Sequence, residues 1–144
     1  MIGLEIDMVV TDSLAAFVLY KTVFDAQEIE ITSLPKGLNE VVYTMFNTRF
    51  HLLDENTEYG LHAPKEEQTQ SMWCNLVIED IVQTVQKAEE TGFHIIQPVT
   101  HVEDYGVMNA IIADPFGYVW MLHQIVKELS FKERNRIMKN MSEK

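Results

Sequence analysis

Two carboxylates and two imidazoles are the side chains of this sequence best suited to acid–base chemistry. Glu5 and Asp7 alternate with apolar residues in one strand pattern, and His51 and His123 stand in two later strand patterns. A carboxylate near apolar walls can acquire a raised pKa, and an imidazole exchanges protons near neutrality without help. The same four groups could instead supply nitrogen and oxygen ligands to a divalent ion. The competing interpretation gives the two histidines no chemical role, one half-buried in its strand and the other at a cavity rim.

The other reactive groups stand where catalysis is not favoured. Three serines fall in helix caps or loops: Ser13, Ser33 and Ser71. The single Cys74 alternates away from the face of the acid–base candidates, so we interpret it as a small buried thiol. One cysteine excludes an internal disulfide framework, and with no basic-then-apolar leader pattern it favours a cytoplasmic location. No glycine-rich loop for phosphate binding is present.

The elements that carry these groups occur twice in the sequence. Residues 4–12 and 72–80 each form an alternating strand pattern that ends in an Asp able to cap a helix. The two copies lie 68 positions apart, and each continues with a helix pattern and strand-forming segments, which in the second copy lie at about 93–97, 107–113 and 118–125. The repeat predicts an α+β fold in which two βαβββ modules form one pseudo-symmetric, curved mixed sheet. We expect a ligand site in the concavity of that sheet.

We expect one structural domain with four segments. These are a first module over 1–56, a connector over 57–71, a second module over 72–126 and a helical tail over 127–144. Ser130 and Glu133 form a capping-box pattern that begins a helix in the tail. The apolar residues of this helix, Phe131, Met138 and Met141, could lie at an interface between subunits.

The charge balance restricts the class of partner. The chain has 22 acidic and 11 basic residues and a formal net charge of −11. Nucleic-acid-binding proteins need a basic surface, so such a partner is not expected. The acidic balance mildly favours a cationic or neutral small ligand, although a charged surface that keeps the protein soluble is the better explanation. No run of 18 apolar residues exists, so we expect no membrane partner.

Three stretches of the chain resemble a known superfamily. They are 9–12 with 19–21 and Phe24, then 105–106 with 114–120, and last 127–133. Their order and spacing resemble the vicinal oxygen chelate superfamily, which includes glyoxalase I, bleomycin-resistance proteins and extradiol dioxygenases, and are most similar to its PhnB-like branch. The resemblance implies the fold but not the reaction, because this fold hosts isomerases, dioxygenases, lyases and binding proteins.

The resemblance also implies where a metal would bind. Metal-using members place His or Glu on four inward strands, at positions that correspond here to Glu5, Leu53, Trp73 and Met121. Leucine, tryptophan and methionine cannot replace such ligands for a hard or borderline ion, so we predict no metal cofactor. Asp7, His51 and His123 lie two positions from three of these sites. Strand alternation aims them at the same cavity, where they could rescue a metal site.

Without a metal, the concavity would be a small-molecule pocket with apolar walls and a few polar groups. Its predicted residues are Glu5, Asp7, Leu53, Trp73, Asn75, Met121 and His123. An aromatic face beside carboxylates suits an aromatic or cationic ligand. The competing interpretation is that Trp73 and Met121 simply fill the concavity as core.

Three functions remain open from the sequence. The first is a binding protein without turnover. The second is an isomerase, lyase or dioxygenase that uses a metal or the catalytic candidates Glu5, His51 and His123. The third is a scaffold that acts only through its dimer surface. The resemblance implies a homodimer in every case.

Overall fold

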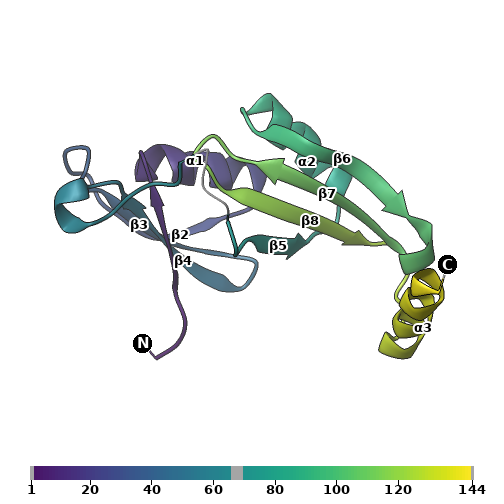
Figure 1. Ribbon diagram of the computed structural model, residues 1–144. Coiled ribbons are helices and arrows are strands. Elements are labelled where there is room, and N and C mark those ends of the chain that lie inside the picture. Colours follow the sequence, from purple (N-terminus) through teal and green to yellow (C-terminus); the bar gives the residue numbers. More distant parts are fainter. Residues whose placement is uncertain (1, 66–69, 144) are drawn as a thin grey trace.

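The computed structural model describes residues 2–65 and 70–143, and these form the two predicted βαβββ modules (Figure 1). The first contains β1 (Ile6–Val10), α1 (Ser13–Val23), β2 (Gln27–Ile31), β3 (Glu40–Met45) and β4 (Thr48–Asp54). The second contains β5 (Cys74–Val77), α2 (Ile81–Glu90), β6 (His94–Val102), β7 (Val107–Ala113) and β8 (Val119–Ile125). Two 3-10 turns, η1 (Thr57–Tyr59) and η2 (Glu103–Tyr105), and the terminal helix α3 (Phe131–Ser142) complete the chain.

Each module is a four-stranded mixed sheet with one helix across it. The strand order is β1-β4-β3-β2 in the first sheet and β5-β8-β7-β6 in the second. Each strand of the second module therefore takes the same place in its sheet as the corresponding strand of the first. In both sheets the first strand pairs in parallel with the last, and the remaining pairs are antiparallel. The predicted α+β fold and its duplication are therefore confirmed.

The repeated Asp begins the helix of each module. Asp12 accepts a hydrogen bond from the Ala15 amide at 3.1 Å, and Asp80 accepts one from the Gln83 amide at 3.0 Å. Each carboxylate satisfies an amide that the first helical turn would otherwise leave unpaired. The two caps fix where each strand turns into its helix.

Strand alternation separates a helix-covered face from an open face in each sheet. In β4, Phe50 and Leu52 are buried beneath α1, whereas His51 is only partly buried on the other face. In β8, Trp120 and Leu122 are buried in the same way. The open faces are therefore the faces on which the predicted site residues alternate.

The two modules share one core beneath α1 and α2, which lie on the same side of the sheets (Figure 1). The Trp120 ring of the second module packs against Tyr20 of α1 and against Phe24, which directly follows α1, with centroids 5.4 and 5.1 Å away. Phe24 also meets Phe93 edge-on at 5.8 Å. The aromatic rings of the two modules therefore pack against one another in the shared core.

Two buried carboxylates hold the loops around this core. Asp114 accepts hydrogen bonds from Tyr20 at 2.5 Å, from the Trp120 indole at 2.9 Å and from the Phe116 and Tyr118 amides at 2.8 and 3.0 Å. Burial raises the pKa of Asp114, although these four donors oppose the rise.

The second buried carboxylate, Asp54, closes the first module. It accepts hydrogen bonds from the amides of Ser13, Gly37 and Asn39 at 2.7, 2.9 and 3.0 Å. Burial by itself would raise the pKa of Asp54, but the amide donors outweigh burial and leave the pKa below its ordinary value.

One strand is longer than predicted. The strand predicted to end at Gln97 continues to Val102, because register shifts on both sides of Gln97 let β6 pass Pro98 without losing its partner β7. In the connector, Ala63 is buried and the Gln70 side-chain amide donates to the Gly117 carbonyl. The Glu66-Glu67 pair of the predicted connector lies outside the described residues. None of the described helices is long and apolar enough to cross a membrane.

Candidate functional site

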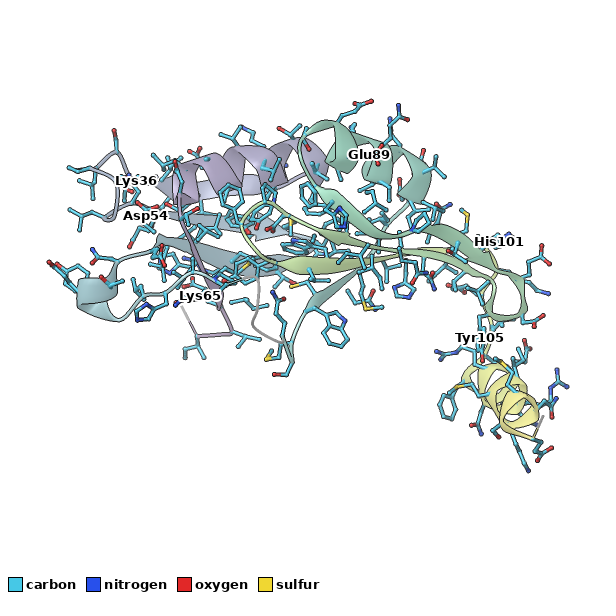
Figure 2. All side chains as sticks on the ribbon, turned by 45° about the horizontal axis from the view of Figure 1, so that its top comes forward. Lys36, Asp54, Lys65, Glu89, His101 and Tyr105 are labelled. Atoms are coloured by element: carbon cyan, nitrogen blue, oxygen red, sulfur yellow. The ribbon has the colours of Figure 1, made fainter. Side chains whose placement is uncertain are left out.

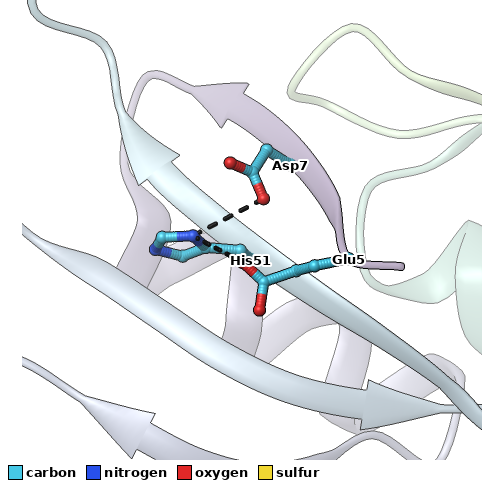
Figure 3. Close-up of side chains that lie close together, drawn as sticks. All are labelled: Glu5, Asp7 and His51. Carbon is cyan, nitrogen blue, oxygen red and sulfur yellow. Dashed lines mark ion pairs between the residues drawn. The ribbon is translucent and has the colours of Figure 1, made fainter. Parts of the chain in front are cut away.

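A charged group occupies the open face of the first sheet (Figure 3). Asp7 on β1 and His51 on β4 are direct partners in the parallel register, and Glu5 immediately precedes β1. The Nδ1 atom of His51 lies 3.1 Å from Glu5 Oε1 and 3.5 Å from Asp7 Oδ1. The structure therefore brings together three of the four acid–base candidates.

Two further residues complete this charged group. The Arg49 guanidinium contacts the second oxygen of Glu5 at 2.5 Å, and Glu40 on β3 lies 3.7 Å from His51 Nε2. The Nε2 atom is buried and finds no hydrogen-bond partner among the described residues. Neither Arg49 nor Glu40 was predicted as a site residue. Strand alternation was the available signal for Arg49, because it lies two positions before His51 on the same face.

The surroundings shift the pKa values of the Glu5 and Asp7 carboxylates in opposite directions. The hydrogen bond from Arg49 lowers the pKa of Glu5, and the nearby His51 contributes in the same direction. Loss of hydration raises the pKa of Asp7, and the charges of Glu5 and Glu40 add to the rise while His51 opposes it. A divergent pair of this kind can hold one carboxylate ionised while the other exchanges a proton.

The open face of the second sheet is mainly apolar. Trp73 immediately precedes β5, and its side chain is 55% exposed. Met121 lies between the buried Trp120 and Leu122 of β8 and pairs with Asn75 in the register. An indole with half of its surface in water is available to stack on a ligand.

His123 belongs to this second face and not to the charged group. Its Nδ1 atom is hydrogen-bonded to the side-chain oxygen of Asn75 on the neighbouring strand. This contact ties the His123 ring to the amide of Asn75. The chain thus presents its polar candidates as two separate groups, one on each sheet.

Sequence reasoning missed two amides that extend this second group. Asn109 on β7 is the direct partner of His123, and it accepts a hydrogen bond from Gln97 on β6 at 2.9 Å. A single polar residue at an open-face position of the otherwise apolar β7 was the signal that could have identified Asn109.

Trp73 lies between two hollows of the surface. One, of about 670 Å³, is formed by Pro64, Lys65 and Gln70 of the connector and the loop after β7, and His94 and Val119 also line it. The other, of about 520 Å³, lies between β5 and the turn that joins β3 to β4, and Asn75 and Val77 line it. The sequence pattern predicted no role for His94, which lines the same hollow as Trp73.

The four positions implied for a family metal do not provide a suitable set of ligands. Leu53, Trp73 and Met121 offer no oxygen or imidazole donor, and Arg49 and His51 already occupy both oxygens of Glu5. A different set, Glu5, Asp7 and His51, has ligand atoms within 4.8 Å of one another. The Arg49 charge at 2.5 Å from Glu5 disfavours a cation there.

Comparison with known proteins agrees with the geometry of the fold. A family model described as Glyoxalase/Bleomycin resistance protein/Dioxygenase superfamily matches residues 4–122. A search of curated proteins by sequence found no match.

Solved structures share the fold at low sequence identity. The fosfomycin resistance protein FosX from Listeria monocytogenes, complexed with Mn(II) and sulfate, is similar with a TM-score of 0.68 and 15% identity over 96% of this chain and 99% of that one. FosX from Mesorhizobium loti has a TM-score of 0.65 and 16% identity, covering 94% and 99% of the two chains. The hypothetical protein SA1046 from S. aureus has a TM-score of 0.64 and 19% identity, covering 86% and 94%.

Proposed function

Since the chain belongs to the glyoxalase/bleomycin resistance protein/dioxygenase superfamily, we propose that it is a small-molecule-binding protein that works without the family's metal site. Its ligand would combine an aromatic surface with a positive charge. The observation that carries this proposal is the replacement of three metal positions by Leu53, Trp73 and Met121, while Arg49 and His51 hold the fourth residue, Glu5. Side chains that cannot bind a metal can still form the walls of a pocket.

The distribution of charge between the two sheets supports this choice of ligand. The first sheet presents the carboxylates of Asp7 and Glu40 beside His51, and the second presents the exposed Trp73 with apolar neighbours. A cationic ring stacked on the indole gains from cation–π attraction, and the carboxylates on the other sheet add charge attraction at longer range. The predicted pocket residues Leu53, Asn75, Met121 and His123 would supply the remaining walls and hydrogen bonds.

The finer parts of the proposal come from the family resemblance. We place the chain in the PhnB-like branch, as a homodimer in the cytoplasm, with the four segments given by the repeat. A homodimer agrees with the two open sheet faces, because a second copy could cover them and enclose the ligand.

The Trp73→Ala variant should bind benzyltrimethylammonium about tenfold more weakly than the natural protein, because an aromatic face contributes roughly 1–2 kcal/mol to a partly desolvated cation. Asp7→Asn should weaken binding by a similar factor. Isothermal titration calorimetry measures both changes. Tyr59→Ala is the control, since Tyr59 is another exposed aromatic residue, on η1 and away from the proposed pocket residues.

The neutral isostere neopentylbenzene separates the two contributions. It should bind less tightly than the cation to the natural protein, and it should be insensitive to Asp7→Asn. Equal binding of the cation by the natural protein and by both variants would contradict the proposed pocket.

Because of the charged group around His51, an enzyme is the second candidate function. Glu5, Asp7 and His51 lie close enough together to hold a divalent cation or to act as an acid–base set, and a protein of the same fold is known with Mn(II). In an enzyme, Asp7 or His51 would move the proton and Glu5 would stay ionised beside Arg49.

Metal content distinguishes the two candidates. Elemental mass spectrometry of protein purified without chelator should find metal well below one equivalent, and the content should be the same for His51→Gln. Near-stoichiometric metal that His51→Gln removes would favour the enzyme and would contradict the binding protein.

A further inference from the structure

The terminal helix α3 stands apart from the rest of the molecule. Its main contact is with η2, where the Tyr105 hydroxyl lies 3.0 Å from the Met141 sulfur (Figure 2). Phe131 and Met138 lie on the same stripe of the helix and are 75% and 60% exposed. An amphipathic helix with its apolar stripe in water has a face available for a partner.

The direction in which α3 leaves the body is fixed by Gly106. The Gly106 carbonyl accepts hydrogen bonds from the Val126 and Lys127 amides at 2.7 and 2.9 Å. Gly106 itself has φ +65°, and a Cβ there would lie 2.2 Å from the Lys127 carbonyl oxygen. Only glycine allows this approach. The helix is therefore held as an arm pointing away from the body.

The arm has the opposite charge to the rest of the chain. It contains Lys132, Arg134, Arg136 and Lys139 but only one acidic residue, Glu133, so its formal charge is +3. Because the whole chain carries −11, the remainder carries −14. A basic arm on an acidic body is attracted to the surface of another copy.

Strand β2 offers a surface complementary to the arm. Among the described strands it pairs with β3 alone, and all five of its residues are exposed. Glu28 and Glu30 provide negative charge, and Ile29 and Ile31 are apolar side chains left in water. An edge strand with exposed isoleucines needs cover to avoid unspecific association.

The arm cannot reach β2 of its own chain. It follows β8 after only five residues, 126–130, and it lies beyond the far end of the second module (Figure 1). Figure 1 shows β2 beside β3 and β4, with β7 and β8 of the second module between it and α3. The complementary surface must therefore belong to another molecule.

We propose that α3 docks on the β2 edge of a second copy, with Phe131 and Met138 against the isoleucines and the basic residues near Glu28 and Glu30. In a twofold dimer each copy would give one arm and receive one. This inference rests on the homodimer of the proposed function but adds its contact surface. It commits to a protein partner because the −14 body would be repelled by an anionic membrane.

Charge reversal in the chain of residues 1–144 tests whether α3 docks on β2 of a second copy. Arg136→Glu with Lys139→Glu should raise the dimer dissociation constant at least about tenfold in sedimentation equilibrium at low salt. Glu28→Lys with Glu30→Lys should do the same, and the fourfold variant should return to within about threefold of the natural protein. Lys21→Glu with Lys87→Glu is the matched control, since it changes the net charge equally on exposed positions of α1 and α2.

The outcomes are distinguishable. If neither charge reversal changed the dimer dissociation constant, the docking of α3 on β2 would be contradicted, but the homodimer would not. A natural protein that is monomeric at every concentration would overturn the arm and the homodimer together, whereas binding of benzyltrimethylammonium is measured separately. Phosphatidylserine vesicles that bind the natural protein but not the arm reversal, with the dimer unchanged, would assign α3 to a membrane and overturn the proposal.

Discussion

Replacing Asp114 by Ala should lower the free energy of unfolding by about 3–5 kcal/mol. The substitution removes the acceptor of four hydrogen bonds, from the Tyr20 hydroxyl, the Trp120 indole and two amides of the following loop. Trp120 and Tyr20 are 1% and 0% exposed, so water cannot replace the lost carboxylate. Urea unfolding followed by far-UV circular dichroism measures the change.

Tyr20→Phe is the control for Asp114→Ala. It deletes one of the four donors and keeps the ring in the aromatic cluster, so it should cost about 1–2 kcal/mol. If Asp114→Ala were no more destabilising than Tyr20→Phe, the carboxylate would not join the two modules in the way its contacts indicate.

Asp54→Asn should cost about 2–3 kcal/mol at neutral pH, and the cost should disappear in acid. The three amides of Ser13, Gly37 and Asn39 converge on its two oxygens, and an amide group would turn its own N–H toward some of them. The pKa of Asp54 is lower in the folded than in the unfolded chain. Its contribution is therefore complete above the unfolded value, about 3.9, and is lost as the pH falls through the folded pKa.

Chemical unfolding of the natural protein and Asp54→Asn between neutral pH and acid measures this difference. Asp114 should affect the pH dependence of stability in the opposite direction. Its pKa is raised in the folded state, so its ionisation makes the fold less stable as the pH rises from the unfolded value through the folded one. A cost of Asp54→Asn that stayed constant with pH would show that the charge of Asp54 is not what the amides bind.

The sequence predicted the fold well because the duplication repeats strong local signals. Asp12 and Asp80 are helix caps that can be recognised from their place between a strand pattern and a helix pattern. Alternation in the strands separates the two faces of each sheet correctly. The predicted end of β6 at Gln97 was wrong. A proline such as Pro98 usually ends a strand, and only the pairing with β7 shows that a β-bulge accommodates it.

The site was predictable only where alternation on one strand was enough. It predicted that Asp7 and His51 share a face, and they do. It could not predict that Arg49 takes one oxygen of Glu5, or that His123 bonds to Asn75, away from the carboxylates. Those choices depend on which strands become neighbours and on how far apart the two sheets lie.

The hydrogen bond from Tyr20 to Asp114 spans 94 residues of chain, and this has a consequence for synthesis on the ribosome. Helix α1 leaves the exit tunnel long before Trp120 and Asp114 do, so the first module must wait with Tyr20 and Phe24 uncovered. A nascent chain in that state exposes the surface that chaperones recognise. The first module therefore completes its core only after the second has been synthesised.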